Sequence, residues 1–162
     1  ATYLKSQGVH NALINIGGNI LALGDKGGQA WKVGIQHPRR AGALAMLELH
    51  DGEAIGTSGD YQRFFEVDGK RYCHLIDPRS GWPADQAQAV TVIAHGAHAG
   101  TLSDVASKPL FIAGPGDWPR LAAKMGIREA LFIAADGSLG ATRAMNARLI
   151  RDQSLAAVKV VD

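Results

Sequence analysis

Residues 74–81, His-Leu-Ile-Asp-Pro-Arg-Ser-Gly, are the part of this chain best suited to chemistry. His74 is followed within a few residues by the carboxylate of Asp77 and the guanidinium of Arg79. The proline and glycine in the run indicate a loop, because both residues disfavour a continuing strand. Binding and catalytic residues commonly lie on loops held by a rigid scaffold. His74 is therefore a candidate functional residue; the alternative is a strand-end histidine that only hydrogen-bonds the loop.

A β-hairpin is predicted to deliver His74 to this loop. Residues 64–67 and 71–76 have strand-like sequences, and the Asp-Gly pair between them favours the left-handed backbone of a tight turn. Side chains alternate along a strand, so Cys73 faces away from His74. We interpret Cys73 as a small core residue and not as a nucleophile. As the single cysteine, it excludes an internal disulfide.

A second candidate segment is residues 57–61, Thr-Ser-Gly-Asp-Tyr. It places two hydroxyls, a glycine, a carboxylate and a phenol within five residues, and its amides and hydroxyls are suited to binding a phosphate. The same residue types favour an ordinary turn. The sequence alone favours the turn.

Gly17 and Gly18 separate the apolar runs 11–16 and 19–23. A double glycine between strand segments predicts a bulge or a close approach of another backbone or a ligand. The spacing is not G-x-G-x-x-G and no helix follows, so this is not a dinucleotide-binding fingerprint.

A helix is predicted from residue 98 to about residue 113, because apolar residues recur there at three- and four-residue spacings. Asp104 and Lys108 are four residues apart and face the same side of this helix. One interpretation is a surface ion pair. The alternative makes Asp104 an oxygen ligand of a hard cation such as Mg²⁺. Lys108 would compete with that metal, or would contact a phosphate directly.

The remaining pattern predicts an α+β fold with a mainly antiparallel sheet and a helical layer. Short strands are joined by turns, and the helices cluster between residues 97 and 126, which does not match the alternation of a parallel sheet. Pro109 is expected to kink the helix, and a second helix is expected to begin at a cap on Asp117. Further strands are predicted at residues 30–35, 43–49, 53–56, 89–94, 129–134, 141–145 and 156–161.

The composition is that of a globular domain: 46% of the 162 residues are hydrophobic and 20% are charged. The net charge is only +2 and the basic residues are scattered, so no nucleic-acid partner is predicted. No apolar run approaches the about 20 residues of a membrane helix, and no signal peptide is predicted within these residues. Residues 1–7 have the character of a helix end capped by Gly8, so the chain is expected to begin inside a longer protein.

Several segments resemble one family in order and spacing, from residue 1 to about residue 145. That family is the FAD:protein FMN transferases, or ApbE-like flavin transferases, formerly called thiamine biosynthesis lipoproteins. Five segments in register make the resemblance specific. They are residues 12–20, 31–38, 57–61, 74–83 and 90–92.

The resemblance implies a Mg²⁺-dependent transferase that cleaves FAD at its pyrophosphate and attaches FMN to a threonine of an acceptor flavoprotein, with AMP as the other product. His74 matches the family's active-site histidine near the flavin phosphates, as a general base or a stabiliser of charge. Ser58, Gly59 and Tyr61 are the further flavin-binding candidates. Asp104 matches a metal ligand, and Ser107 is the other candidate ligand.

Two departures from the family pattern lead to an alternative. Lys108 stands where the family usually has a metal-binding threonine, and family members are roughly twice this length. The resemblance thus predicts that residues 1–162 form the C-terminal portion, with the N-terminal half elsewhere. The alternative is a non-catalytic flavin-binding accessory domain with an altered metal site. The resemblance also implies a periplasmic or membrane-anchored protein, with any anchor outside this chain.

Overall fold

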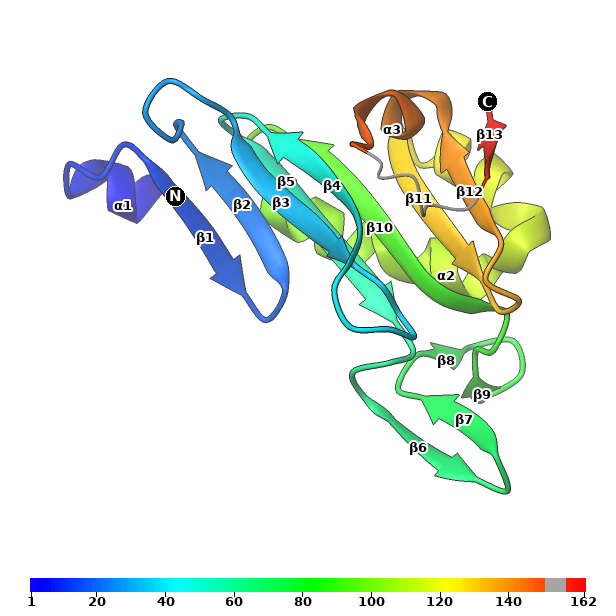
Figure 1. Ribbon diagram of the computed structural model, residues 1–162. Helices are drawn as coiled ribbons and strands as arrows, with labels where there is room; N and C mark the ends of the chain where they lie inside the picture. The colour runs from blue at the N-terminus through cyan, green and yellow to red at the C-terminus, as the bar shows by residue number, and fades with distance from the viewer. Residues whose placement is uncertain (151–156) are drawn as a thin grey trace.

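The computed structural model describes residues 1–150 and 157–162 and is built on one large sheet (Figure 1). Seven strands lie in the order β1-β2-β5-β10-β11-β12-β13, and every neighbouring pair is antiparallel except the parallel pair β12–β13. The predicted α+β class with a mainly antiparallel sheet is confirmed. The strands are β1 (Ala12–Ile16), β2 (Asn19–Leu23), β5 (Glu53–Gly59), β10 (Ala87–His95), β11 (Glu129–Ala134), β12 (Leu139–Thr142) and β13 (Val158–Val161).

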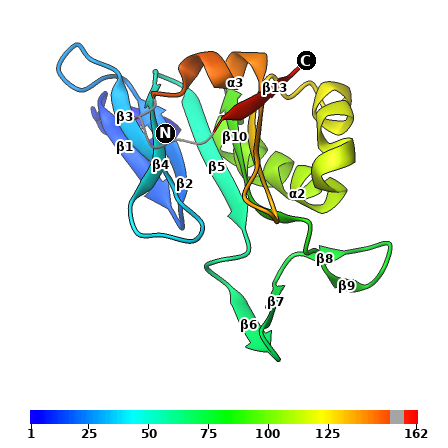
Figure 2. The same ribbon diagram turned by 45° about the vertical axis from the view of Figure 1, so that its right-hand side comes forward.

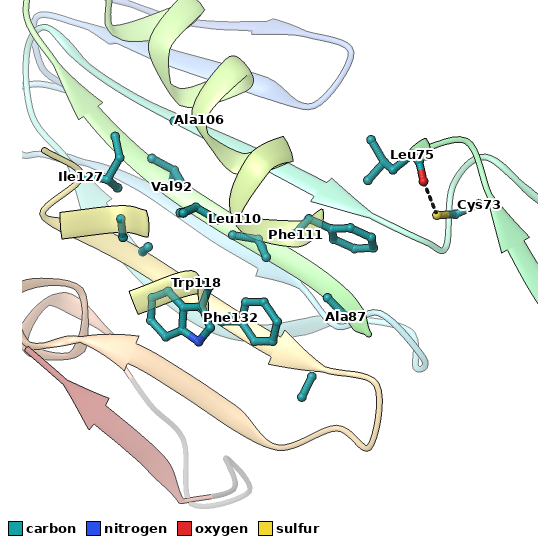
Figure 3. Packing of buried hydrophobic residues seen from close by; sticks show 14 residues of the cluster. Cys73, Leu75, Ala87, Val92, Ala106, Leu110, Phe111, Trp118, Ile127 and Phe132 are labelled. Carbon is teal, nitrogen blue, oxygen red and sulfur yellow. Dashed lines mark hydrogen bonds between the residues drawn. The ribbon is translucent and has the colours of Figure 1, made fainter. Parts of the chain in front are cut away.

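Helix α2 (Ala99–Lys124) covers one face of this sheet and encloses the larger core (Figures 1 and 3). Leu110 and Phe111 of the helix are fully buried against strand residues such as Val92. The ring of Trp118 stacks on that of Phe132, with centroids 5.4 Å apart. These contacts fix the helix, and with it Asp104 and Lys108, relative to the sheet.

The predicted division of this region into two helical segments is confirmed, but one detail was wrong. The backbone leaves helical geometry at Gly114, with φ of 76°, directly after the predicted end of the first helix near residue 113, whereas Pro109 keeps helical φ and ψ angles. Gly114 tolerates this left-handed conformation because it has no Cβ. The helical segment that follows already includes Pro115 and Gly116, so Asp117 lies within it and is not its cap.

The opposite face of the sheet is covered by a hairpin and a short helix (Figure 2). The hairpin consists of β3 (Trp31–Gln36) and β4 (Ala43–Leu49), and the helix is α3 (Arg143–Arg148). Their inward side chains, including Ile35, Leu47 and Met145, are almost fully buried against the sheet. The sheet is thus enclosed between α2 on one side and this second apolar layer on the other.

Two small hairpins project from the end of the sheet where β5 finishes and β10 begins (Figures 1 and 2). They are β6 (Phe64–Val67) with β7 (Lys70–Cys73), and β8 (Ile76–Asp77) with β9 (Trp82–Pro83). The predicted tight turn between β6 and β7 is confirmed, because Asp68 and Gly69 both have positive φ, 50° and 73°. The short helix α1 (Thr2–Ser6) precedes β1, as predicted.

Three local predictions were wrong or incomplete. Gly17 and Gly18 form the hairpin turn between β1 and β2 and not a bulge, with φ of 60° and 93°. The strand expected at residues 141–145 ends at Thr142, whose hydroxyl instead caps α3 by accepting from the Met145 N–H. The last predicted strand is confirmed at Val158–Val161, whereas residue 156 lies outside the described residues. Among the described residues, no helix has the length and apolarity needed to cross a bilayer.

Gly56 sets the distance between β5 and α2. A Cβ built on Gly56 would lie 2.7 Å from the backbone carbonyl of Ser103, which cannot rotate away. We expect Gly56→Ala to lower the free energy of unfolding by about 1–3 kcal/mol, the usual cost of overpacking a core. Urea denaturation measures this. Gly116→Ala is the matched control, because a Cβ added there would meet nothing within 4 Å, and an equal effect at both positions would contradict the prediction.

A buried charge network lies at the opposite end of the sheet from the small hairpins. Arg148 of α3 donates to the carboxylates of Glu53 on β5 and Glu129 on β11, at 3.0 and 3.1 Å. His95 also contacts both carboxylates, at 3.3 and 2.7 Å. Each glutamate side chain is only 11% exposed. The network joins three strands and a helix that local sequence patterns do not connect.

The pH dependence of stability follows from Glu53. Burial opposes ionisation of this carboxyl, but hydrogen bonds from Arg148 and from the His50 N–H hold its pKa below the ordinary value of 4.5. The stability that this group contributes is therefore present above pH 4.5 and lost as the pH falls through the lowered folded-state pKa. We expect the difference in unfolding free energy between wild type and Glu53→Gln to narrow below that pH. A difference that stays constant in acid, measured by urea denaturation, would contradict this.

Candidate functional site

A polar cavity of about 320 Å³ lies between β5, α2 and the segments that flank the β6–β7 hairpin. Five of the predicted site residues line it. They are Ser58, Gly59, Tyr61, His74 and Asp104. The cavity thus gathers residues from a strand, a hairpin and a helix that are well separated in sequence. A concave site with convergent polar groups is the usual form of a small-molecule site.

His74 is the residue directly after β7, and it lines the cavity. Its backbone N–H and its ring Nδ1 both lie 3.2 Å from the carbonyl oxygen of Arg63. A carbonyl only accepts, so in the neutral ring Nδ1 carries the proton and Nε2 keeps its lone pair. The structure thus combines the two interpretations of His74: the ring hydrogen-bonds the loop and also lines the cavity. A fixed tautomer with Nε2 available as an acceptor is the arrangement that a general base requires.

Ser58 and Ser107 link the sheet to the helix behind the cavity wall. Their hydroxyl oxygens are 2.7 Å apart, and Ser107 Oγ donates to the carbonyl of Asp104 at 2.9 Å. Because Ser107 has one hydroxyl proton, Ser58 is the donor in the pair. Ser107 is fully buried and does not line the cavity.

Residues 57–59 belong to β5 and not to the turn favoured by the sequence, since their pairing with β10 outweighs local turn preference.

Tyr61 follows β5, and its ring packs on Gly59, the last residue of that strand. A Cβ at Gly59 would lie 2.3 Å from the Tyr61 ring, so glycine is what permits this contact. Burial, together with the nearby carboxylate of Asp60, raises the pKa of the Tyr61 phenol above its ordinary value. Tyr61 therefore stays a neutral hydrogen-bonding group with an aromatic face at neutral pH.

Asp104 and Lys108 form the ion pair predicted from their spacing. Lys108 Nζ lies 2.9 Å from Asp104 Oδ1 and also 2.9 Å from the backbone carbonyl of Asp104. Both residues line the cavity. The pair places a positive charge, held by two oxygens one turn away, on the helix wall of the site.

The candidate ligand set does not fit a divalent cation in this chain. Asp104 is the single carboxylate among the described residues that line the cavity, and Lys108 contacts one of its oxygens. Ser107 is turned away, in hydrogen bonds to Ser58 and to a backbone carbonyl. Within residues 1–150 and 157–162, no group of three or more His, Cys, Asp or Glu side chains is placed to hold a metal. A metal at Asp104 would lie beside the Lys108 ammonium, and like charges repel.

Other residues of the 74–81 run serve the loop. Arg79 makes a two-pronged contact with Asp77, at 2.7–3.1 Å, and its guanidinium also donates to the carbonyl of Ile112 on α2 at 3.1 Å. The hydrogen bonds from the Arg79 side chain and backbone to Asp77 lower the pKa of the Asp77 carboxyl. Asp77 and Arg79 therefore attach the loop to the helix and do not line the cavity with His74.

Cys73 has the structural role that strand alternation predicted. It is 4% exposed and belongs to the core under α2 (Figure 3). Its thiol contacts the carbonyl oxygens of Leu75 and Ala84, at 3.8 and 3.3 Å. Burial raises the pKa of this thiol. A buried thiol kept protonated is a poor nucleophile.

Sequence reasoning did not single out several cavity residues. Gln62 and Arg63 lie in the connection after β5, whereas Gly17, from the β1–β2 turn, had been noted as a place of close approach. Gln62 and Arg63 lie in the sequence between the candidate segments 57–61 and 74–81. This position was the one sequence signal that could have identified them. Arg63 adds a second cationic side chain to the cavity. With His74, Arg63 and Lys108 facing one carboxylate, the cavity is suited to an anionic ligand.

Comparisons with known proteins identify the family of this chain. The ApbE family model matches residues 1–132. The chain is 43% identical over 146 residues to an FAD:protein FMN transferase of Rhodobacter capsulatus. The aligned residues make up 90% of this chain and 27% of that protein. It is 32% identical to the enzyme of the same name from Treponema pallidum, over 93% of this chain and 46% of that protein.

Solved structures give the same result. The flavinyl transferase ApbE of Pseudomonas stutzeri in its apo form matches with a TM-score of 0.74 and 36% identity, over 93% of this chain and 47% of that one. An ApbE protein from Thermotoga maritima matches with a TM-score of 0.77 and 30% identity, over 88% of this chain and 45% of that one. The chain thus spans about half or less of the length of these relatives. Because the fold, the family model and the sequence matches agree, this chain belongs to the ApbE family.

Proposed function

We propose that this chain supplies catalytic and phosphate-binding residues to an enzyme that transfers FMN from FAD to a threonine of an acceptor protein. The observation that carries the proposal is the position of His74, with Nδ1 on the Arg63 carbonyl and the ring in a cavity that Lys108 also lines. Relatives of this chain are named FAD:protein FMN transferase, which supports the same reaction.

The reaction breaks one phosphoanhydride bond, in FAD, and forms one phosphoester bond, on the threonine. The threonine hydroxyl attacks the phosphorus on the FMN side of the FAD pyrophosphate, and a new P–O bond forms. The bond from that phosphorus to the bridging oxygen breaks, and AMP leaves with its phosphate. Nε2 of His74 accepts the hydroxyl proton, and Arg63 and Lys108 stabilise charge on the phosphate oxygens. Such transfers depend mainly on positioning and on stabilisation of charge.

The flavin-binding assignment of Ser58, Gly59 and Tyr61 belongs to this proposal. The Tyr61 ring lines the cavity and offers an aromatic surface. Family resemblance also implies Mg²⁺, with Asp104 and Ser107 as ligands. The Lys108–Asp104 pair and the buried position of Ser107 argue against these ligands here, so no step above uses a metal.

The remaining partners and the cellular location are also proposed. We infer that residues outside this chain complete the FAD site, which is consistent with the 45–47% of the solved relatives that it spans. The acceptor is a flavoprotein subunit that presents a threonine hydroxyl, and no nucleic acid takes part. By family membership, the protein works in the periplasm or on a membrane anchor, which fractionation of cells that express the tagged full-length protein tests.

The proposed reaction is tested with the full-length protein, FAD and a threonine-containing acceptor. We expect release of AMP, detected by chromatography, and an acceptor mass increased by FMN less one water. The same acceptor with alanine in place of threonine is the control. If FAD binds but no AMP appears, the chain belongs instead to a flavin-binding accessory protein. If FAD does not bind either, both functions are wrong.

A further inference from the structure

We propose that the Lys108 ammonium is a built-in cation of this site, which contacts a phosphate of the nucleotide ligand directly and removes the need for a divalent metal. The inference rests on the proposed function for the identity of the ligand, FAD. Its physical basis is the arrangement of Lys108, Asp104 and Arg63 around one cavity.

Asp104 orients Lys108. The lysine folds back by one helical turn, and its Nζ lies 2.9 Å from both the carbonyl and the carboxylate Oδ1 of Asp104. An ammonium has three N–H donors, and these contacts use two. Lys108 remains 41% exposed and lines the cavity, so the third donor is available to a ligand. The ammonium group of Lys108 is thus a cation that belongs to the helix itself and is held in position by Asp104.

The surrounding charges favour an anion at this position. The Asp104 carboxylate balances the positive charge of Lys108, and Arg63 adds a second positive charge to the cavity. His74 places its ring in the same cavity. A phosphate bound there meets two cationic side chains and one imidazole, whereas a divalent metal meets one carboxylate that is already paired.

The attachment of Lys108 to the fold supports a positioned role. The next two residues along the helix, Pro109 and Leu110, are part of the α2 segment packed on the sheet, and Leu110 is fully buried. On the other side, Ser107 is fully buried and bonded to Ser58 of β5. The backbone that carries Lys108 is therefore held on both sides, so the ammonium needs little reorganisation to meet a ligand.

The test uses the full-length protein with excess EDTA, in wild type, Lys108→Met and Lys124→Met. Lys124 is the matched control, because it is an exposed lysine of the same helix outside the cavity. FAD affinity is measured by quenching of flavin fluorescence, and AMP release is measured with and without Mg²⁺. We expect wild type and Lys124→Met to bind FAD and release AMP in EDTA. Lys108→Met is expected to bind FAD about 10- to 100-fold more weakly, as expected for loss of one charged hydrogen bond.

The outcomes separate this inference from the proposed function. AMP release by wild type only when Mg²⁺ is added would overturn the role of Lys108 and leave the proposed function intact. Absence of AMP release under every condition would refute the proposed function, and FAD binding in EDTA would then decide the inference alone. Equal FAD affinity of Lys108→Met and Lys124→Met would overturn it. Circular dichroism of each variant verifies that the fold is retained.

Discussion

Replacing His74 with alanine is expected to lower the rate of FMN transfer by about 10²–10⁴-fold, the usual contribution of a general acid–base group. The fold should be unaffected, because the His74 side chain is exposed and its ring makes one hydrogen bond, to the Arg63 carbonyl. FAD binding should change little, since Lys108 and Arg63 remain. The measurement is AMP release at saturating FAD and acceptor, with the melting temperature recorded for each variant.

The control for this experiment is His98→Ala. His98 is also exposed, but it lies before α2 and does not line the cavity. The His98→Ala substitution should therefore leave both the transfer rate and the stability unchanged. Wild-type turnover by His74→Ala would remove His74 from the mechanism and leave its hydrogen bond to Arg63 as its only role.

Arg148→Met is expected to lower the free energy of unfolding by about 3 kcal/mol, at the lower end of the usual cost of breaking a buried ion pair. The lower end applies because the Arg148 side chain is 19% exposed. The substitution leaves Glu53 and Glu129 close together, and His95 is the remaining described side chain that contacts both carboxylates. Two buried carboxylates that lose their common cation repel each other and are poorly solvated.

Urea denaturation at neutral pH measures this effect, and Arg120→Met is the matched control. Arg120 pairs with Asp117 at the surface, where its side chain is 78% exposed, so its loss should cost less than about 1 kcal/mol. If Arg148→Met is no more destabilising than Arg120→Met, the network contributes little to folding. Transfer activity well below the denaturation range should not change, because Arg148 does not line the cavity.

The two sets of charges differ in their surroundings. The Arg148 network is enclosed between α3 and the sheet, and its cation contacts two carboxylates at once. Lys108 and Arg63, in contrast, line a cavity and face one carboxylate. A buried charge is tolerated when it is paired, whereas charges left facing a cavity attract a ligand of opposite sign. This contrast identifies which cations are available for binding.

Much of the local structure followed from short-range patterns. The Asp68-Gly69 turn was predicted because few residue pairs adopt two left-handed conformations in succession. The Asp104–Lys108 pair was predicted from its four-residue spacing. The failures were also local in origin: residues 57–59 are rich in turn formers, yet β10 pairs with them along the strand. Hydrogen bonds to a distant strand outweigh a turn preference of a few tenths of a kcal/mol to about 1 kcal/mol.

By itself, the sequence determined the fold class, the family and the candidate residues, because turn chemistry, periodicity and motif spacing are all local properties of the chain. Only the tertiary structure decided how those candidates act together. Ser58 contacts Ser107 across 49 positions, and Arg148 contacts Glu53 across 95. Such contacts depend on how α2 and α3 pack on the sheet, which no local pattern encodes. Packing also turned Ser107 away from the cavity and left Lys108 within it, and this difference is the basis of the role proposed for Lys108.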